Sequence, residues 1–434
     1  MTLLLTVSGK CFNTEQCHSL ALTQNPALDY NASVHQIHHT EPLKAALQQV
    51  AEMYLDNAAT SFPKPECVYT AVNDWLRTGM AAGRGSHQGT DDTGRMIDQG
   101  RSRLAQLLGL SSPSRVIYTL NCTDSLNLVL QGYLNDGDRV VASTIDHNSV
   151  LRPLQALKQR GITVELADFD PLSGQIDVEQ FSRLVSSHPT RLAVITHASN
   201  VTGTLQPIQE LIRIAHKAGV AVLLDAAQTA GHIPISMEEL AIEFLATAGH
   251  KGLLGPLGTG VLCLGTDQEK FLRPLRYGGT GTSSELLEQP FETPSRYESG
   301  NANVPGIAGL NAGAEWIQKE TVESIHRRNQ TLTNSLLNGL REIPGVEVLS
   351  PVQSENVGIV TFNIRNQDCR EVAMILDQSF QIQCRAGLHC APLTHRTLGT
   401  FEKGGAVRLS PGVFTTDDEI LSAIEAVHAI AQHG

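Results

Sequence analysis

The stretch LAVITHASNVTGTLQPIQELIRIAHKAGVAVLLDAAQ, residues 192–228, decides the fold. It begins with a continuously apolar run, passes through a polar turn and a helix-length amphipathic segment, and ends in a second apolar run. Strands that are apolar on both faces are typical of parallel sheets covered by helices on both sides. The stretch therefore predicts a strand–helix–strand unit of an α/β protein.

The same alternation recurs from about residue 115 onward. Each apolar run is followed by a turn and an amphipathic segment of helical length. This spacing predicts a mainly parallel, seven-stranded sheet in a large domain. The predicted strands span residues 116–119, 140–143, 163–167, 192–196, 220–224, 244–247 and 260–264.

The chain changes character twice along its length. We place the large domain at residues 53–304, because a long helical pattern then begins and is followed by shorter strand signals. Residues 305–434 are predicted to form a smaller α+β domain, against which residues 53–65 pack. Residues 1–52 lack this rhythm, and we interpret them as an N-terminal extension that is disordered or results from a wrongly assigned start.

Composition excludes several classes of protein. The 434 residues are 41% hydrophobic and 18% charged, as in an ordinary globular chain. With 32 Lys and Arg against 44 Asp and Glu, the net charge of −12 argues against a nucleic acid as the main partner. The eight cysteines include no CxxC pair, so we expect neither a disulfide framework nor a metal site. No signal peptide and no run of about 18 apolar residues occurs, which predicts a cytoplasmic protein without a membrane segment.

Two charged residues stand at the ends of neighbouring predicted strands, where ligands of parallel α/β sheets bind. Asp225 ends the apolar run VAVLLD, where a carboxylate is costly unless a cation pairs with it or it caps the next helix. Lys251 follows in the Gly-rich turn AGHKGLLGPLGTG, and a buried lysine of lowered pKa can form a Schiff base. Proteins hold pyridoxal phosphate with a Lys on its aldehyde and an Asp on its ring nitrogen, so the pair predicts that cofactor.

The other turns offer the remaining groups that this cofactor needs. NCTDSLNLVL at 121–130 predicts a helix start that can hold a phosphate, with Thr123 as a hydroxyl donor. His147 offers a flat ring to stack on the cofactor. Asn200 and Gln228 are candidate donors to its phenolic oxygen.

Six segments together carry a family resemblance: LDNAATSFPKP at 55–65, IDHNSV at 145–150, HASNVTG at 197–203, LDAAQTAGHIPI at 224–235, GHKGLLGPLGTG at 249–260 and RAGLHCAPL at 385–393. They resemble the class V pyridoxal-phosphate-dependent aminotransferase superfamily, and within it the SufS/NifS-like cysteine desulfurases. The resemblance extends from about residue 54 to 432. It implies the fold of type I pyridoxal-phosphate-dependent transferases.

The resemblance also implies how the cofactor is held. Lys251 would be the Schiff-base lysine and a proton shuttle, Asp225 the partner of the ring nitrogen, and His147 the stacked imidazole with a part in proton transfer. The remaining cofactor residues implied are Gln228 and Asn200 on the ring oxygen, Cys122 (through its backbone N–H), Thr123 and His250 on the phosphate, and Thr280 on the phosphate of the neighbouring subunit of a homodimer.

For the substrate, L-cysteine, the resemblance implies three contacts. Arg408 would clamp the carboxylate with the bidentate geometry of a guanidinium. Arg385, in the RAGLHCAPL segment, is a second cation, and Asn57 lies in the LDNAAT motif. One position departs from the family pattern: Ala248 stands three residues before Lys251, where a hydroxyl residue is usual.

Cys390 decides the subfamily. A lone cysteine is by default a small buried hydrophobe, but this one stands beside His389 and near Arg385, and positive neighbours favour a thiolate. In the family such a cysteine takes the sulfur of L-cysteine as a persulfide, releases L-alanine and passes the sulfur to an acceptor protein. The alternatives are a selenocysteine lyase, another class V C–S lyase or aminotransferase, and a cofactor-binding sulfur-relay protein without turnover.

Overall fold

The computed structural model describes residues 53–82, 87–283 and 285–433. Its largest feature is a seven-stranded sheet with the strand order β2-β8-β7-β6-β5-β3-β4. Strands β7, β6, β5, β3 and β4 run parallel, whereas β8 runs antiparallel to both of its neighbours. The predicted α/β class with a mainly parallel sheet is confirmed. The strands are β2 (Val116–Thr119), β3 (Arg139–Ser143), β4 (Thr163–Ala167), β5 (Leu192–Thr196), β6 (Ala221–Asp225), β7 (Phe244–Ala248) and β8 (Gly260–Leu264).

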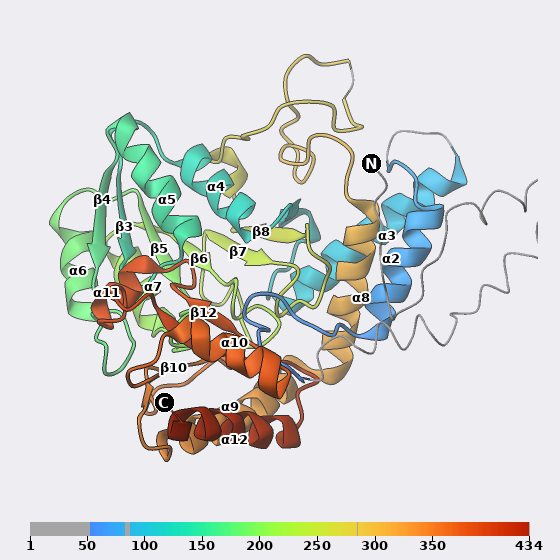
Figure 1. The fold of residues 1–434 in the computed structure, drawn as a ribbon. Coiled ribbons are helices and arrows are strands. Elements are labelled where there is room, and N and C mark those ends of the chain that lie inside the picture. The colour runs from blue at the N-terminus through green and yellow to red at the C-terminus, as the bar shows by residue number, and fades with distance from the viewer. Residues whose placement is uncertain (1–52, 83–86, 284, 434) are drawn as a thin grey trace, which may run out of the picture. The chain divides into compact units, whose positions relative to one another are not determined.

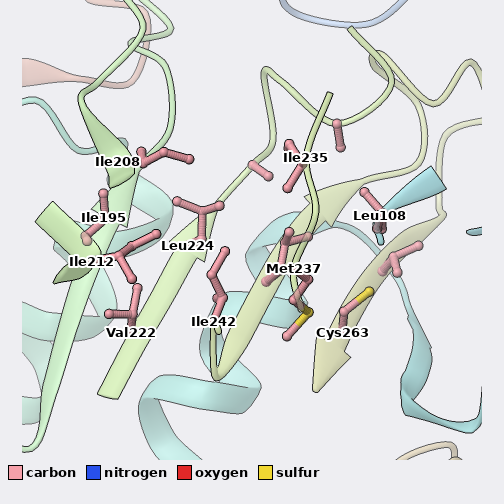
Figure 2. Packing of buried hydrophobic residues seen from close by; sticks show 14 of the residues in the cluster. Leu108, Ile195, Ile208, Ile212, Val222, Leu224, Ile235, Met237, Ile242 and Cys263 are labelled. Atoms are coloured by element: carbon pink, nitrogen blue, oxygen red, sulfur yellow. The ribbon is translucent and has the colours of Figure 1, made fainter. Parts of the chain in front are cut away.

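Both faces of this sheet are buried, because successive side chains of a strand point to opposite faces. Along β6, Val222 and Leu224 belong to one hydrophobic cluster and Leu223 to another. Figure 2 shows the first cluster, in which Ile212 of a covering helix lies with Val222. The continuous apolar runs of the sequence follow from this double burial. The helices between the strands are α4 (Cys122–Tyr133), α5 (Asn148–Leu157), α6 (Val178–Ser187) and α7 (Ile208–Lys217) (Figure 1).

Three helices pack beside the large sheet. They are α2 (Glu66–Thr78), α3 (Gln88–Leu107) and α8 (Val304–Glu320), and their apolar side chains share one cluster. Helix α8 also contributes Leu310, Ala314 and Ile317 to the core of the large sheet. The described residues group as one compact unit, so the boundary between residues 304 and 305 stays a prediction.

The second sheet is antiparallel and four-stranded, in the order β12-β13-β10-β9. Its strands are β9 (Val346–Val348), β10 (Val360–Ile364), β12 (Arg385–Gly387) and β13 (Ala406–Leu409). Side chains of this sheet share a core with α9 (Val322–Arg341), α10 (Cys369–Phe380) and α12 (Asp417–His433), drawn in orange to red in Figure 1. The short helix α11 (Pro392–Thr397) connects β12 to β13.

The first described segment joins this second core. Strand β1 (Met53–Tyr54) pairs in parallel with β11 (Ile382–Gln383), and Leu55 is fully buried in the same cluster. Residues 1–52, which we interpret as an extension, lie outside the described residues. Across the described ranges, no helix combines the length and apolar character that a membrane span requires.

Candidate active site

A cavity of about 170 Å³ opens at the carboxyl ends of the parallel strands. The turns that follow β2, β3, β5, β6 and β7 line it, as expected for a parallel α/β sheet. It brings together every residue predicted to bind the cofactor except Thr280. The lining residues are Asn121, Cys122, Thr123, His147, Ser149, Thr196, Ala198, Asn200, Asp225, Ala227, Gln228, Ala248, His250 and Lys251.

Asp225 is the last residue of β6 and is buried. Its Oδ1 accepts hydrogen bonds from the backbone N–H of Ala227 at 3.0 Å and from the thiol of Cys122 at 3.5 Å. Its Oδ2 accepts none from the described residues. Burial raises the pKa of Asp225, opposed by these hydrogen bonds and by the nearby Lys251. A carboxylate in this position has an unused acceptor and favours a cationic partner.

Lys251 follows β7 by three residues and reaches the same cavity. Burial lowers its pKa, and the cations Arg408 and Arg385 add to this, whereas Cys122 and Asp225 oppose it. No hydrogen bond from Lys251 to another described residue is formed. A desolvated amine with a lowered pKa is a nucleophile and a proton acceptor.

The N-terminus of α4 forms one end of the cavity. Asn121 caps the helix by accepting a hydrogen bond from the backbone N–H of Asp124. The N–H groups of Cys122 and Thr123, in the first turn, have no acceptor within the helix, and such groups bind anions. Nearby, Nδ1 of His250 is buried and has no partner in the described chain. The structure thus brings these groups together, and their binding of a phosphate stays a prediction.

The tautomer of His147 is fixed by its neighbour. Its Nδ1 accepts a hydrogen bond from the backbone N–H of Ser149 at 3.0 Å, so the proton of the neutral ring is on Nε2. Burial, and next the charge of Lys251, lowers the pKa of His147 to about 4. The ring is therefore neutral at pH 7. Ser149 in turn bonds to the hydroxyl of Thr123 at 2.7 Å, which links the two predicted cofactor residues.

Asn200 and Gln228 lie in the cavity wall with part of their hydrogen-bonding capacity used. The amide of Gln228 donates to the carbonyl of Ala58 at 3.1 Å, and that of Asn200 donates to the carbonyl of His389 at 2.7 Å. Each NH₂ group has a second N–H. Their predicted contact with the cofactor oxygen stays a prediction.

Arg408 is held on β13 with 1% of its surface exposed. Its guanidinium donates to Asp56 at 2.7 Å and to the carbonyl of Asn200 at 3.0 Å, while its Nε is buried without a partner. Arg385 lies directly opposite Arg408 in the pairing of β12 with β13. Two facing arginines favour binding of an anion between them.

Asn57 sits beside this pair but is bonded to the backbone. Its amide donates to the carbonyls of Tyr54 at 3.3 Å and Ser410 at 3.1 Å, and accepts from the N–H of Phe62 at 3.1 Å. It holds the segment after β1 in place. Its predicted contact with the substrate stays a prediction.

Cys390 stands in a tight turn with φ of +57°, and His389 before it has φ of +50°. The left-handed conformation costs about 1–2 kcal/mol for each such residue, so other contacts must hold the turn. The carbonyl of Cys390 accepts from the N–H of Asn148 at 2.7 Å, and Asn200 holds that of His389. Nη2 of Arg385 donates to Cys390 Sγ at 3.4 Å. The turn is thereby tied to the loops that form the cavity wall.

Thr280 does not reach this cavity. Its hydroxyl bonds to that of Thr282 at 3.0 Å, and both residues line a second cavity, of about 490 Å³, which residues of β2 also line. Its predicted contact with the phosphate of a neighbouring subunit stays a prediction.

Sequence reasoning missed Asp56 and Ser149. Asp56 follows directly on the apolar residue Leu55 in the LDNAAT motif, so a carboxylate beside a buried position was the available signal. Ser149 lies two residues after His147, the spacing of a local side-chain-to-backbone turn.

Comparisons with known proteins agree with this architecture. The family model for the class-V aminotransferases matches residues 53–422. A probable cysteine desulfurase of Methanothermobacter thermautotrophicus is 34% identical over 387 residues, which cover 88% of this chain and 95% of the relative. The solved apo structure of a cysteine desulfurase from Thermococcus onnurineus NA1 matches with a TM-score of 0.82 and 29% identity, covering 88% of this chain and 95% of that one. The cysteine desulfurase CsdA of Escherichia coli matches with a TM-score of 0.78 and 27% identity, covering 89% and 96%. The chain belongs to the class-V aminotransferase family.

Proposed function

We propose that this protein is a pyridoxal-phosphate-dependent cysteine desulfurase that converts L-cysteine to L-alanine and keeps the sulfur as a persulfide on Cys390. The observation that carries the proposal is the anchoring of the Cys390 turn. Asn148 and Asn200, on the loops that line the cavity, bind the carbonyls of Cys390 and His389. A thiol beside a cavity that suits this cofactor is the arrangement a desulfurase needs. The relatives named cysteine desulfurases support it.

The residues present fit the cofactor. Asp225 has an unused carboxylate oxygen, His250 has a buried nitrogen without a partner, and the first N–H groups of α4 are free to bind an anion. Asp225 would hold the ring nitrogen, Lys251 the aldehyde, and Thr123, His250 and the start of α4 the phosphate. When bound, pyridoxal phosphate supplies an electron sink for the charge that develops at Cα.

Two groups of this chain then handle protons. Lys251 accepts the Cα proton of the substrate with its neutral amine, because burial disfavours the ammonium form. His147 carries its proton on Nε2 and stays neutral at pH 7, since protonation requires a pH near 4. It can therefore donate a hydrogen bond from Nε2 while Ser149 holds the ring orientation.

Arg408 and Cys390 act on the two ends of the substrate. The buried Nε of Arg408, which lacks a partner, is the group available for the substrate carboxylate. Cys390, as a thiolate held by Nη2 of Arg385, attacks the substrate sulfur. A sulfur–sulfur bond forms and the Cβ–sulfur bond breaks. The electron pair of the broken bond is protonated at Cβ, and Lys251 returns a proton to Cα, which yields L-alanine and Cys390 persulfide.

We further propose a homodimer in which Thr280 reaches the phosphate of the partner. Several large apolar side chains in the region of Thr280 are exposed, which is unusual for an isolated chain. These are Leu257 (68% exposed), Tyr277 (71%), Leu287 (102%) and Phe291 (75%).

The finer parts of the function follow from the same site. Selenocysteine is the alternative substrate, and a sulfur-acceptor protein is the expected partner. A cytoplasmic location stays a prediction, and a reducing compartment would keep the Cys390 thiol available.

The experiment compares alanine and sulfide release by the cofactor-loaded wild type, Cys390→Ala and Cys67→Ala, each with cysteine and with selenocysteine. Cys67 is an exposed thiol and serves as the control. We expect Cys390→Ala to lose most cysteine-dependent alanine release and Cys67→Ala to retain it. Equal rates in all three proteins would reject the proposal. A separate Lys251→Ala variant should fail to develop the yellow colour of bound pyridoxal phosphate.

A further inference from the structure

A hydrogen-bonded row of three buried polar side chains extends from the Cys390 turn through α11 to Thr400. His389, His395 and Thr400 are each at most 2% exposed. Nδ1 of His389 lies 3.2 Å from Nε2 of His395, and Nδ1 of His395 lies 2.7 Å from the hydroxyl of Thr400. None of the three touches the cavity where the cofactor is expected. The mechanism proposed above does not use His395 or Thr400.

Only one direction of hydrogen bonding gives every donor and acceptor of these three side chains a partner. Nε2 of His389 lies 3.4 Å from the carbonyl of Arg385, which can only accept, so that nitrogen carries the proton. Burial lowers the pKa of both rings, that of His395 to about 4, so each carries a single proton. Nδ1 of His389 must then accept from Nε2 of His395, and Nδ1 of His395 must accept from Thr400.

At its other end this hydrogen-bonded row reaches Arg385, the residue that contacts the Cys390 thiol. Arg385 contributes its carbonyl to His389 and its Nη2 to Cys390 Sγ, so residues 385–390 form a closed ring of contacts. Asn148 and Asn200 hold the carbonyls of the same turn from the other side. The His389 ring is therefore one of the contacts that hold the turn against Arg385.

We propose that His395, with Thr400 behind it, is a positioning residue that fixes the orientation of the His389 ring and thereby holds the Cys390 thiol against Arg385. The proposal rests on the proposed role of Cys390 as the sulfur-receiving thiol. If the donor on His395 is lost, the buried Nδ1 of His389 is left without a partner, and the ring is held only by the contact of its Nε2–H with the Arg385 carbonyl. The ring can then rotate away from the Arg385 carbonyl, and the Cys390 turn loses one of the contacts that orient it.

The first test reads the step at Cys390. His395→Phe removes the donor at similar size, whereas His395→Gln keeps an N–H at the position of Nε2. Thr400→Val and Thr400→Ser form a second pair, and Thr333→Val is the control, because Thr333 is a buried threonine that bonds within α9 at 2.6 Å. Cofactor-loaded proteins are mixed with cysteine, and the colour change on substrate binding and the persulfide on Cys390 are followed separately by absorbance and mass spectrometry.

We expect His395→Phe and Thr400→Val to slow persulfide formation by roughly tenfold to 100-fold, the scale of a misplacement of about 1 Å, while the colour change and KM stay as in the wild type. His395→Gln and Thr400→Ser should recover most of the rate. Wild-type rates in His395→Phe and Thr400→Val overturn the proposal, and so does equal impairment of Phe and Gln variants at 395. If one variant does not fold, the pair at the other position gives the answer.

The second test does not depend on turnover. Nitrogen-15 NMR of histidine-labelled protein distinguishes the two tautomers, and His389→Gln assigns the signal of His389. We expect the proton on Nε2 in the wild type, and a shift of the unprotonated Nδ1 signal in His395→Phe because the donor to that nitrogen is gone. A wild-type His389 protonated on Nδ1 rejects the proposal even if the desulfurase activity is present. Absence of persulfide in the wild type would instead reject the proposed function and leave this reading of the tautomer in force.

Discussion

Replacing Asp56 with Asn tests how Arg408 is kept in place. Arg408 is 1% exposed, and its strongest partner is Asp56, whose carboxylate lies 2.7 Å from Nη2 and is 19% exposed. Arg408 already lacks a partner for Nε and faces Arg385 across the sheet. Asp56→Asn would therefore leave a buried cation with its neutralising charge removed.

The expected cost is large because the pair is buried. Breaking a buried ion pair by removing one partner costs about 3–5 kcal/mol of unfolding free energy. We expect about 3 kcal/mol for Asp56→Asn, since the amide oxygen still accepts a hydrogen bond and water reaches the exposed part of the side chain. The matched control is Asp98→Asn: Asp98 also pairs with a buried arginine, Arg101, but at 3.9 Å and with 80% of its side chain exposed. We expect it to lose less than about 1 kcal/mol.

The assay is urea denaturation of the cofactor-free proteins at pH 7, with the unfolding free energies extrapolated to water. Two variants with equal losses below 1 kcal/mol would refute the reasoning, because Arg408 would then not depend on Asp56 for its burial. A loss confined to Asp56→Asn supports it.

Three further predictions concern the cofactor, the pH and the assembly. Ala248→Ser restores a hydroxyl at the end of β7 and should lower the dissociation constant of pyridoxal phosphate about tenfold, measured by absorbance titration; unchanged affinity contradicts the phosphate site. Burial lowers the pKa of His197 to about 4 from an ordinary 6.5, so the unfolded chain binds more protons and stability falls as the pH drops below 6.5. Between pH 7 and pH 5, the unfolding free energy of His197→Gln, measured by urea denaturation, should therefore fall by about 2 kcal/mol less than that of the wild type. Parallel curves of unfolding free energy against pH would contradict the assignment. Leu287→Glu should shift the protein from dimer to monomer, measured by light scattering after gel filtration. A wild-type protein that is itself a monomer would reject the proposed homodimer.

The large sheet could be predicted because its strands are buried on both faces. VAVLLD and LAVIT are continuously apolar, so their hydrophobicity alone marks them, and the structure places strands there within one residue. The same rule put Asp225 and Lys251 at one edge of the sheet, and the structure brings both into one cavity.

Other elements left no such pattern. Helix α3 buries Thr90, Thr93, Gly100 and Arg101 among its apolar residues, so it lacks a clear apolar stripe. Strands β11 and β12 have two and three residues, too few to show an alternation. Short elements of this kind are fixed by tertiary contacts rather than by local sequence.

The contacts at the substrate end could not be predicted either. Arg385 faces Arg408 only through the register of β12 with β13, and Asp56 reaches Arg408 across 352 residues of sequence. His389 meets His395 because two left-handed residues reverse the chain before α11. Each of these pairs depends on a three-dimensional arrangement that no local spacing specifies.

The most direct test of the account is a single turnover followed on the Cys390 peptide. Cofactor-loaded protein receives one equivalent of L-cysteine without an acceptor, and the digest is analysed by mass spectrometry beside an alanine assay. We predict that the peptide with Cys390 gains the mass of one sulfur atom as one equivalent of alanine appears, and that Cys390→Ala forms little alanine. Release of alanine at the same rate from Cys390→Ala, with no sulfur on the wild-type peptide, would contradict the account.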